Sequence, residues 1–122
     1  MKKLLFGTLL LLSSITLSAG DDFCGIRNTA FQAGEITTFK VYYTLGVYIA
    51  AGEATFAVNL EKLNNKPVYH ITGEGKTYGF YDNFFKVRDK YETYMDTTNL
   101  KPYRFIRNID EGGYKKYENA SF

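Results

Sequence analysis

The sequence predicts a single, mainly β domain built from one antiparallel sheet. The chain has 122 residues, 45% of them hydrophobic and 23% charged, a composition typical of one globular domain and unlike that of a disordered chain. Apolar and polar residues alternate with a period of two along most of the chain after residue 30. Clusters of Gly, Asn and Asp separate these alternating segments. Both observations indicate strands joined by short turns.

The first 20 residues have the features of a secretory signal peptide. Lys2 and Lys3 form a positively charged start, residues 4–12 a short apolar core, and residues 18–20 the small side chains that precede cleavage before Asp21. The apolar core is shorter than the about 20 residues needed to span a bilayer, and no later segment is longer. We therefore expect an exported protein, periplasmic and soluble after cleavage, with a signal peptide at 1–20, a polar lead-in at 21–30 and a β domain at 31–122.

Cys24 is the only cysteine, so the chain cannot form an internal disulfide. A lipid anchor needs a cysteine directly after the cleavage site, where this chain has Asp21. A lone cysteine near a chain end is more often incidental than reactive, and the role of Cys24 stays open. Removal of residues 1–20 leaves 13 basic and 13 acidic residues, a balance that argues against nucleic-acid binding.

The first half of the domain predicts three strands. Residues 36–43 alternate strictly, and Leu45-Gly46 is a plausible turn. Residues 47–60 form the second strand, with a bulge or bend at Gly52. Residues 62–66 are a polar turn, after which Pro67 can open the third strand at 68–77 because the first residue need not donate to the ladder.

The second half predicts a short helical segment and three more strands. Between residues 78 and 87 the apolar residues are spaced by four and three, which indicates one or two helical turns. Strands follow at 88–96 and 100–109, separated by the turn 96–99. The sequence Asp110-Glu111-Gly112-Gly113 predicts a hairpin, because glycine tolerates the positive φ of primed turns. The last strand, 114–122, has no strand after it, so we expect an exposed edge and a sheet that is incomplete at the C-terminus.

Few residues point to chemistry. Gly73-Glu74-Gly75-Lys76-Thr77 resembles the end of a phosphate-binding loop, but its first glycine is replaced by His70. His70 is the only histidine, which excludes a His-rich metal site and favours a structural role, although its role stays open. No nucleophile and base can be placed together, so we expect no enzyme, no metal and no cofactor.

Asp89 is a charged residue at a position where the alternation of its strand predicts an apolar one. Alternation places its carboxylate beside Val87, Tyr91 and Met95, on an otherwise apolar face. Such a carboxylate needs a partner, for which Arg104 and Arg107 are the candidates, or it lines a ligand cavity. Both possibilities remain open.

Four groups of motifs together resemble an uncharacterised family of exported bacterial proteins, catalogued as domain of unknown function 3108. They are Phe31-Gln32-Ala33-Gly34-Glu35, Tyr42-Tyr43 with Ala51-Gly52-Glu53-Ala54, Phe84-Phe85-Lys86-Val87-Arg88-Asp89-Lys90-Tyr91-Glu92, and Leu100-Lys101-Pro102-Tyr103-Arg104-Phe105. The resemblance covers about residues 24–118 and implies a Bacteroidetes-like, Gram-negative source. It also implies a curved antiparallel sheet or partial β-barrel with a short helical segment, similar to lipoprotein-carrier folds. Members are longer, so the resemblance implies that this chain is an N-terminal portion or a truncated member, and it supplies no catalytic residues.

Two functional hypotheses follow. The chain has 10 Phe and 11 Tyr, which suit either a core or a groove for an acyl chain or a sugar. The first hypothesis is non-enzymatic binding of an apolar or amphipathic lipid or glycan of the cell envelope by a concave aromatic face, lined by Phe39, Val41, Tyr43, Phe56, Tyr91 and Phe105, with Asp89 and Arg107 as polar groups. The alternative is a structural or assembly module whose exposed last strand pairs with a strand of a partner or with the missing half of its own chain.

Overall fold

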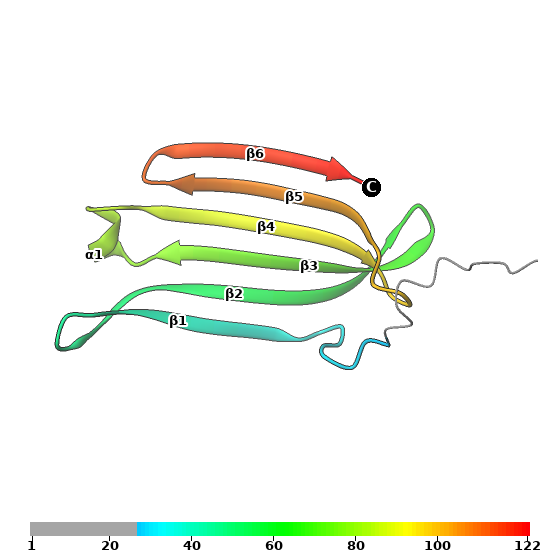
Figure 1. Ribbon diagram of the computed structural model, residues 1–122, viewed down its shortest axis with the longest axis horizontal. Helices are drawn as coiled ribbons and strands as arrows, with labels where there is room; N and C mark the ends of the chain where they lie inside the picture. The colour runs from blue at the N-terminus through cyan, green and yellow to red at the C-terminus, as the bar shows by residue number, and fades with distance from the viewer. Residues whose placement is uncertain (1–26) are drawn as a thin grey trace, which may run out of the picture.

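The computed structural model describes residues 27–122, which form one open, six-stranded antiparallel sheet with its strands in chain order (Figure 1). The prediction of a mainly β fold with a short helical segment is confirmed. The predicted signal peptide and Cys24 lie outside the described residues. The elements are β1 (Ile36–Thr44), β2 (Tyr48–Leu63), β3 (Lys66–Thr77), α1 (Gly79–Asp82), β4 (Val87–Asp96), β5 (Pro102–Glu111) and β6 (Tyr114–Ser121).

The strands lie close to their predicted positions, and β5 differs for a local reason. It begins at Pro102 instead of residue 100, because Leu100 takes a positive φ of 58° and belongs to the preceding turn. The Asp96 side chain holds that turn, since its Oδ1 accepts hydrogen bonds from the backbone N–H groups of Thr98 at 2.7 Å and Asn99 at 3.1 Å. Aspartate commonly closes turns in this way.

The predicted irregularity at Gly52 is a bulge between β1 and β2. Val41 pairs with Gly52 and the next residue, Tyr42, pairs with Ala50, so Ala51 has no partner on β1. Glycine is required at this bulge, because a Cβ on Gly52 would overlap the backbone carbonyl of Lys76 on β3. The extra residue bends β2 at Gly52, where the pairing of β2 with β3 begins.

The pairing register divides the side chains of the sheet into two faces. Face A carries the odd-numbered residues of β1, β3, β4 and β5 and the even-numbered residues of β2 and β6. Beyond the bulge, at residues 48–50, β2 contributes its odd-numbered residues instead, and a second register shift at Tyr94/Met95 places Pro102 opposite Met95. Face B carries the others and holds most of the ion pairs, such as Lys76 with Glu53 at 2.8 Å. Face A therefore presents most of the aromatic and aliphatic residues of the sheet, and face B most of the charged ones.

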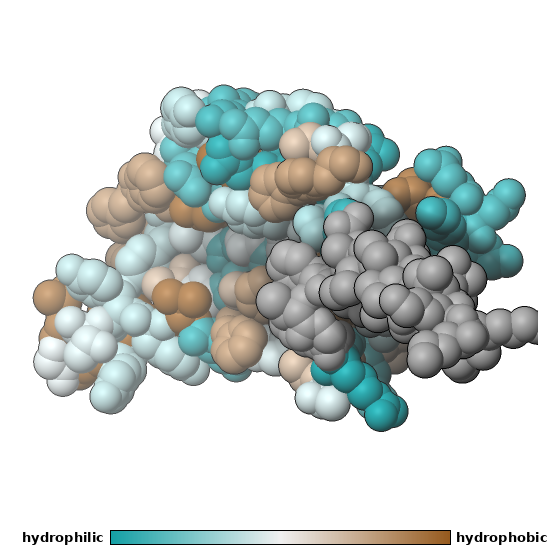
Figure 2. Space-filling view, turned by 45° about the vertical axis from the view of Figure 1, so that its right-hand side comes forward, coloured by the Kyte–Doolittle hydropathy of each residue, from teal (hydrophilic) through white to brown (hydrophobic). Residues whose placement is uncertain are grey.

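Very little of the described chain is buried. Val58, Val68 and Ile109 are the buried hydrophobic residues within 27–122. Figure 1 shows a single layer with α1 at one end, and Figure 2 shows hydrophobic side chains reaching the surface in several places. Sheets normally bury their apolar face against a second layer. Among the described residues, part of face A is covered by the segment before β1, where the Phe31 ring lies edge-on to Tyr69 at 5.3 Å.

Within residues 27–122, no helix is long and apolar enough to cross a membrane.

Candidate binding face

All eight predicted site residues lie on face A, seven of them on one side of the bulge, because the extra residue of the bulge is on β2 and leaves the alternation of β1 unchanged. One row crosses five strands, with Phe56 beside Gly73, Gly73 beside Tyr91, Tyr91 beside Arg107, and Arg107 beside Glu118. In a second row, Phe39 on β1 pairs with Ala54 on β2. The other three predicted residues on this side of the bulge are Val41, Asp89 and Phe105. The eighth residue, Tyr43, lies beyond the bulge, opposite Ile49.

The aromatic rings of face A contact one another but stay exposed. Phe39 and Phe56 meet edge to face with their centroids 6.0 Å apart, and Tyr91 lies 6.4 Å from Phe105. Phe56 lies over Gly73, where a Cβ would come within 3.0 Å of the ring. Phe39 remains 55% exposed and Phe56 47% exposed, so these rings are not buried as a core would bury them.

Beside these rings, face A is hollowed into an apolar trough of about 200 Å³. Gly52, Ala54 and Gly75 form its floor because they have little or no side chain, and Val41 and Val87 form its sides. Of these five residues, Val41 alone was predicted from the sequence as a binding residue. The trough could have been predicted from Gly73 and Gly75, which lie two residues apart and therefore on one face of their strand. Together they leave a strip of that face without side chains.

Charged residues border face A at β4, β5 and β6. Arg107 pairs with Glu118 at 2.5 Å, and Lys116 also pairs with Glu118 at 2.6 Å. The Nε atom of Arg107 is buried and has no hydrogen-bond partner among the described residues. The lysine and the arginine hold the pKa of Glu118 below its usual range, with the Lys116 hydrogen bond as the largest cause.

Asp89 has a different partner from the two arginines that sequence analysis considered. Its carboxyl group neighbours that of Glu111 on face A, and the interaction between the two raises the pKa of Glu111. Asp89 also accepts a hydrogen bond from the backbone N–H of Asp110 at 3.2 Å. The expectation for Arg104 was wrong because Arg104 belongs to face B, where its Nε donates to Asn119 at 2.9 Å. Arg107 shares face A but is held by Glu118.

His70 takes part in a polar cluster on face B. Its Nδ1 lies 2.8 Å from Glu61 and its Nε2 lies 3.0 Å from Glu92, while its ring stacks on Tyr94 at 4.3 Å. Cross-strand contacts of this kind stabilise a sheet. The residues that resemble a phosphate-binding loop, 73–77, are the regular end of β3 and not a loop before a helix. The residues from 27 onward contain no cluster of three or more His, Cys, Asp or Glu side chains suited to a metal.

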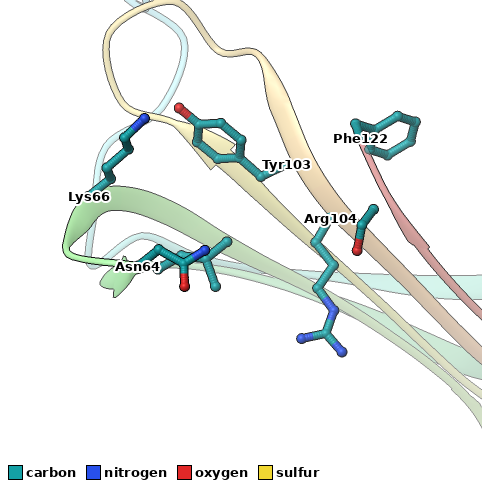
Figure 3. A pocket seen from close by; sticks show the side chains of 7 residues that line it. Asn64, Lys66, Tyr103, Arg104 and Phe122 are labelled. Atoms are coloured by element: carbon teal, nitrogen blue, oxygen red, sulfur yellow. The ribbon is translucent and has the colours of Figure 1, made fainter.

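A second hollow, of about 390 Å³, lies at one end of the sheet and contains none of the predicted residues. Figure 3 shows the lining side chains of Asn64 from the β2–β3 turn and Lys66 from the start of β3. Those of Tyr103 and Arg104 come from the start of β5. Phe122, directly after β6, lies at the margin of the same hollow (Figure 3). This hollow is separate from the aromatic face, because Arg104 belongs to face B.

Comparison with known proteins identifies the family but no individual relative. No curated protein and no solved structure matches the chain. One family model, described as protein of unknown function (DUF3108), matches residues 38–122. The match runs from β1 to the end of β6 and includes every residue of the trough and of the aromatic rows. The chain therefore belongs to the family described as protein of unknown function (DUF3108).

Proposed function

We propose that this protein is exported and binds the acyl chain of an amphipathic cell-envelope lipid along face A, without catalysing a reaction. The observation that carries the proposal is the apolar trough floored by Gly52, Ala54 and Gly75 beside the exposed rings of Phe39 and Phe56. Exposed apolar surface that is continuous over several strands commonly marks a binding site. The signal-like residues 1–20 support a location in the envelope, where such lipids occur.

The lining of the trough favours an acyl chain over a sugar. A sugar has many hydroxyl groups, and each one that is buried without a hydrogen bond lowers affinity. The trough is formed mainly by aliphatic groups and glycine, which can contact methylene groups but cannot satisfy hydroxyls. Covering 100 Å² of apolar surface contributes about 2.5 kcal/mol before the entropy cost of association.

The charged border supports a position for the polar headgroup of such a lipid. Gly75 of the trough floor pairs with Asp89, and Tyr91 pairs with Arg107 on the same face. A chain lying in the trough can therefore extend its polar headgroup toward β4 and β5 without burying it. Asp89 and Arg107 would then orient the headgroup, and the aliphatic floor would supply the affinity.

Filling the trough tests the proposal without removing any existing side chain. In Gly75→Val, the new Cβ has no neighbour closer than 4.0 Å, so we expect the fold to be kept and the two methyl groups to occupy the trough. The probe is cis-parinaric acid, a fluorescent long-chain fatty acid, titrated into the folded protein. We expect its dissociation constant to rise at least about tenfold, a loss of about 1.4 kcal/mol.

Gly79→Val is the matched control, because it makes the same change in open space at the start of α1, outside the trough. It should leave the titration unchanged, and circular dichroism should show the same strand content in both variants. Equal binding by wild type and Gly75→Val, or no binding by folded wild type, would refute the acyl-chain proposal.

A further inference from the structure

The free edge of β6 has a pattern of charge that is complementary to itself. Within the described residues, β6 is hydrogen-bonded to β5 alone, so one side of its backbone has no partner strand. Phe122 donates its backbone N–H to Tyr103 on β5 at 3.0 Å. Because successive residues of a strand bond in opposite directions, the even-numbered residues of β6 bond to β5. The backbone groups of Lys115, Tyr117 and Asn119 therefore point away from the sheet.

We propose that two copies of this chain form a two-fold symmetric dimer through antiparallel pairing of β6 with β6, centred on Tyr117. In this register Tyr117 of each copy exchanges both backbone hydrogen bonds with its equivalent, and Lys115 and Asn119 pair across the axis. Lys116 of each copy then lies directly opposite Glu118 of the other, on face A. Opposite charges at such positions stabilise a strand pair, and like charges destabilise it.

Other self-pairing registers lack this match. Centring the pair on Lys116 places two lysines opposite each other, and centring it on Glu118 places two glutamates opposite each other. Centring it on Lys115 also opposes two lysines, whereas Asn119 gives a shorter overlap with no ion pair. The register centred on Tyr117 is the one that pairs the outward backbone groups over the length of β6 and brings opposite charges together.

Lysine often protects edge strands from pairing, because its positive charge repels a second copy of the edge. In β6 this repulsion is reduced, because each lysine has an acidic neighbour in its own chain. Lys116 lies 2.6 Å from Glu118, and Lys115 lies 3.6 Å from Asp110. The other edge, β1, has Lys40 as its single charged residue and carries the bulge after Val41, so it offers no comparable match. A two-fold axis normal to the sheet would also align face A of both copies on one side.

The test uses paired charge reversals in the purified full chain. Lys116→Glu opposes two glutamates at each contact, and Glu118→Lys opposes two lysines, so each variant alone should dimerise at least about tenfold more weakly than wild type by sedimentation equilibrium. An equal mixture of the two restores opposite charges at both contacts. Native mass spectrometry should then show the mixed dimer in excess of random assortment.

Lys115→Glu is the control, because the same reversal at the neighbouring residue lies opposite neutral Asn119 and should leave dimerisation unchanged. In wild type, protection of the Tyr117 amide from hydrogen exchange should increase with protein concentration. A wild type that is monomeric at every concentration, equal dimerisation of wild type and both reversals, or a mixture without excess mixed dimer would each overturn the proposal. Gly75→Val leaves this edge unchanged, so the outcome is separate from that of the acyl-chain test.

Discussion

Among single residues, the paired carboxyl groups of Asp89 and Glu111 make the clearest electrostatic prediction. The hydrogen bond to Asp89, together with the negative charge of Asp89, raises the pKa of Glu111 above its usual value of 4.5. A raised pKa means that the folded state binds the proton more tightly than the unfolded state does. Binding of this proton therefore stabilises the folded state fully below pH 4.5, the usual pKa of glutamate. The stabilisation is lost as the pH rises through the raised pKa of Glu111.

Glu111→Gln should therefore stabilise the protein at neutral pH, because glutamine keeps a hydrogen-bond donor and removes one of two adjacent negative charges. The gain should disappear at pH values below 4.5, where wild-type Glu111 is protonated. Urea unfolding across this pH range measures both effects. Glu74→Gln is the control, since Glu74 lies on face B near Lys90, and a gain of equal size there would contradict the assignment.

Two glycines of face A should respond differently to the same change. Gly52→Ala places a Cβ on the Lys76 carbonyl, a backbone atom that cannot move without disturbing the β2–β3 ladder. We expect a loss of about 1–3 kcal/mol in the free energy of unfolding. Gly75→Ala adds a Cβ with no neighbour nearer than 4.0 Å and should be neutral or stabilising. Equal effects of both changes in urea unfolding would show that the bulge tolerates a side chain.

Among the elements, the β5–β6 hairpin depends on two consecutive glycines with positive φ. Gly112 has φ 60° and Gly113 has φ 91°, as a type I′ turn requires. Gly113→Ala should cost about 1–2 kcal/mol, because a Cβ is strained in this conformation while the space around it is open. Gly112→Ala should cost more, since its Cβ would also overlap the Phe85 ring.

Thermal unfolding of these two variants measures the difference, and Gly113→Asn should recover part of the loss because asparagine tolerates positive φ. Equal losses at both positions would mean that Phe85 moves aside without cost. The glycine pair was predicted from the sequence as a turn, but the contact of Gly112 with Phe85 was not. Both β4 and β5 separate these two residues in the sequence.

Element positions were the most predictable part of the fold. Period-two alternation predicted β1 to β6, and the spacing of Phe80, Phe84 and Val87 predicted the region of α1. Both signals act within a few residues, so neighbouring residues are enough to set them. The start of β5 was less predictable, because nothing in the local composition indicates that Leu100 takes a positive φ.

For the whole molecule, the single-layer architecture predicts that the folded protein binds apolar dyes. Phe39 and Phe56 form an exposed edge-to-face pair on face A. Replacing both with serine should reduce the fluorescence of bound anilinonaphthalenesulfonate severalfold while the strand content stays unchanged.

The control replaces Tyr42 and Tyr48, an edge-to-face pair of similar separation, 6.4 Å, that lies beyond the bulge. Serine at those positions should leave dye fluorescence near the wild-type level. An equal decrease in both double variants would mean that the dye reports exposed aromatics in general and not face A.

Family membership extends over the whole sheet, yet it adds no activity, because a fold does not imply a function. The arguments for function therefore rest on the geometry of this chain: the trough on face A, its charged border and the free edge of β6.

The sequence by itself determined the mainly β class, the order of the strands along the chain, and which side chains of each strand share a face. Alternation along a strand decides which residues face together, and that property is local. Only the tertiary structure decided that Phe56 lies over Gly73, that Gly52 and Gly75 form one trough, and that Asp89 meets Glu111. These contacts depend on the register between strands, which is set by pairing across the sheet and by the bulge at Gly52.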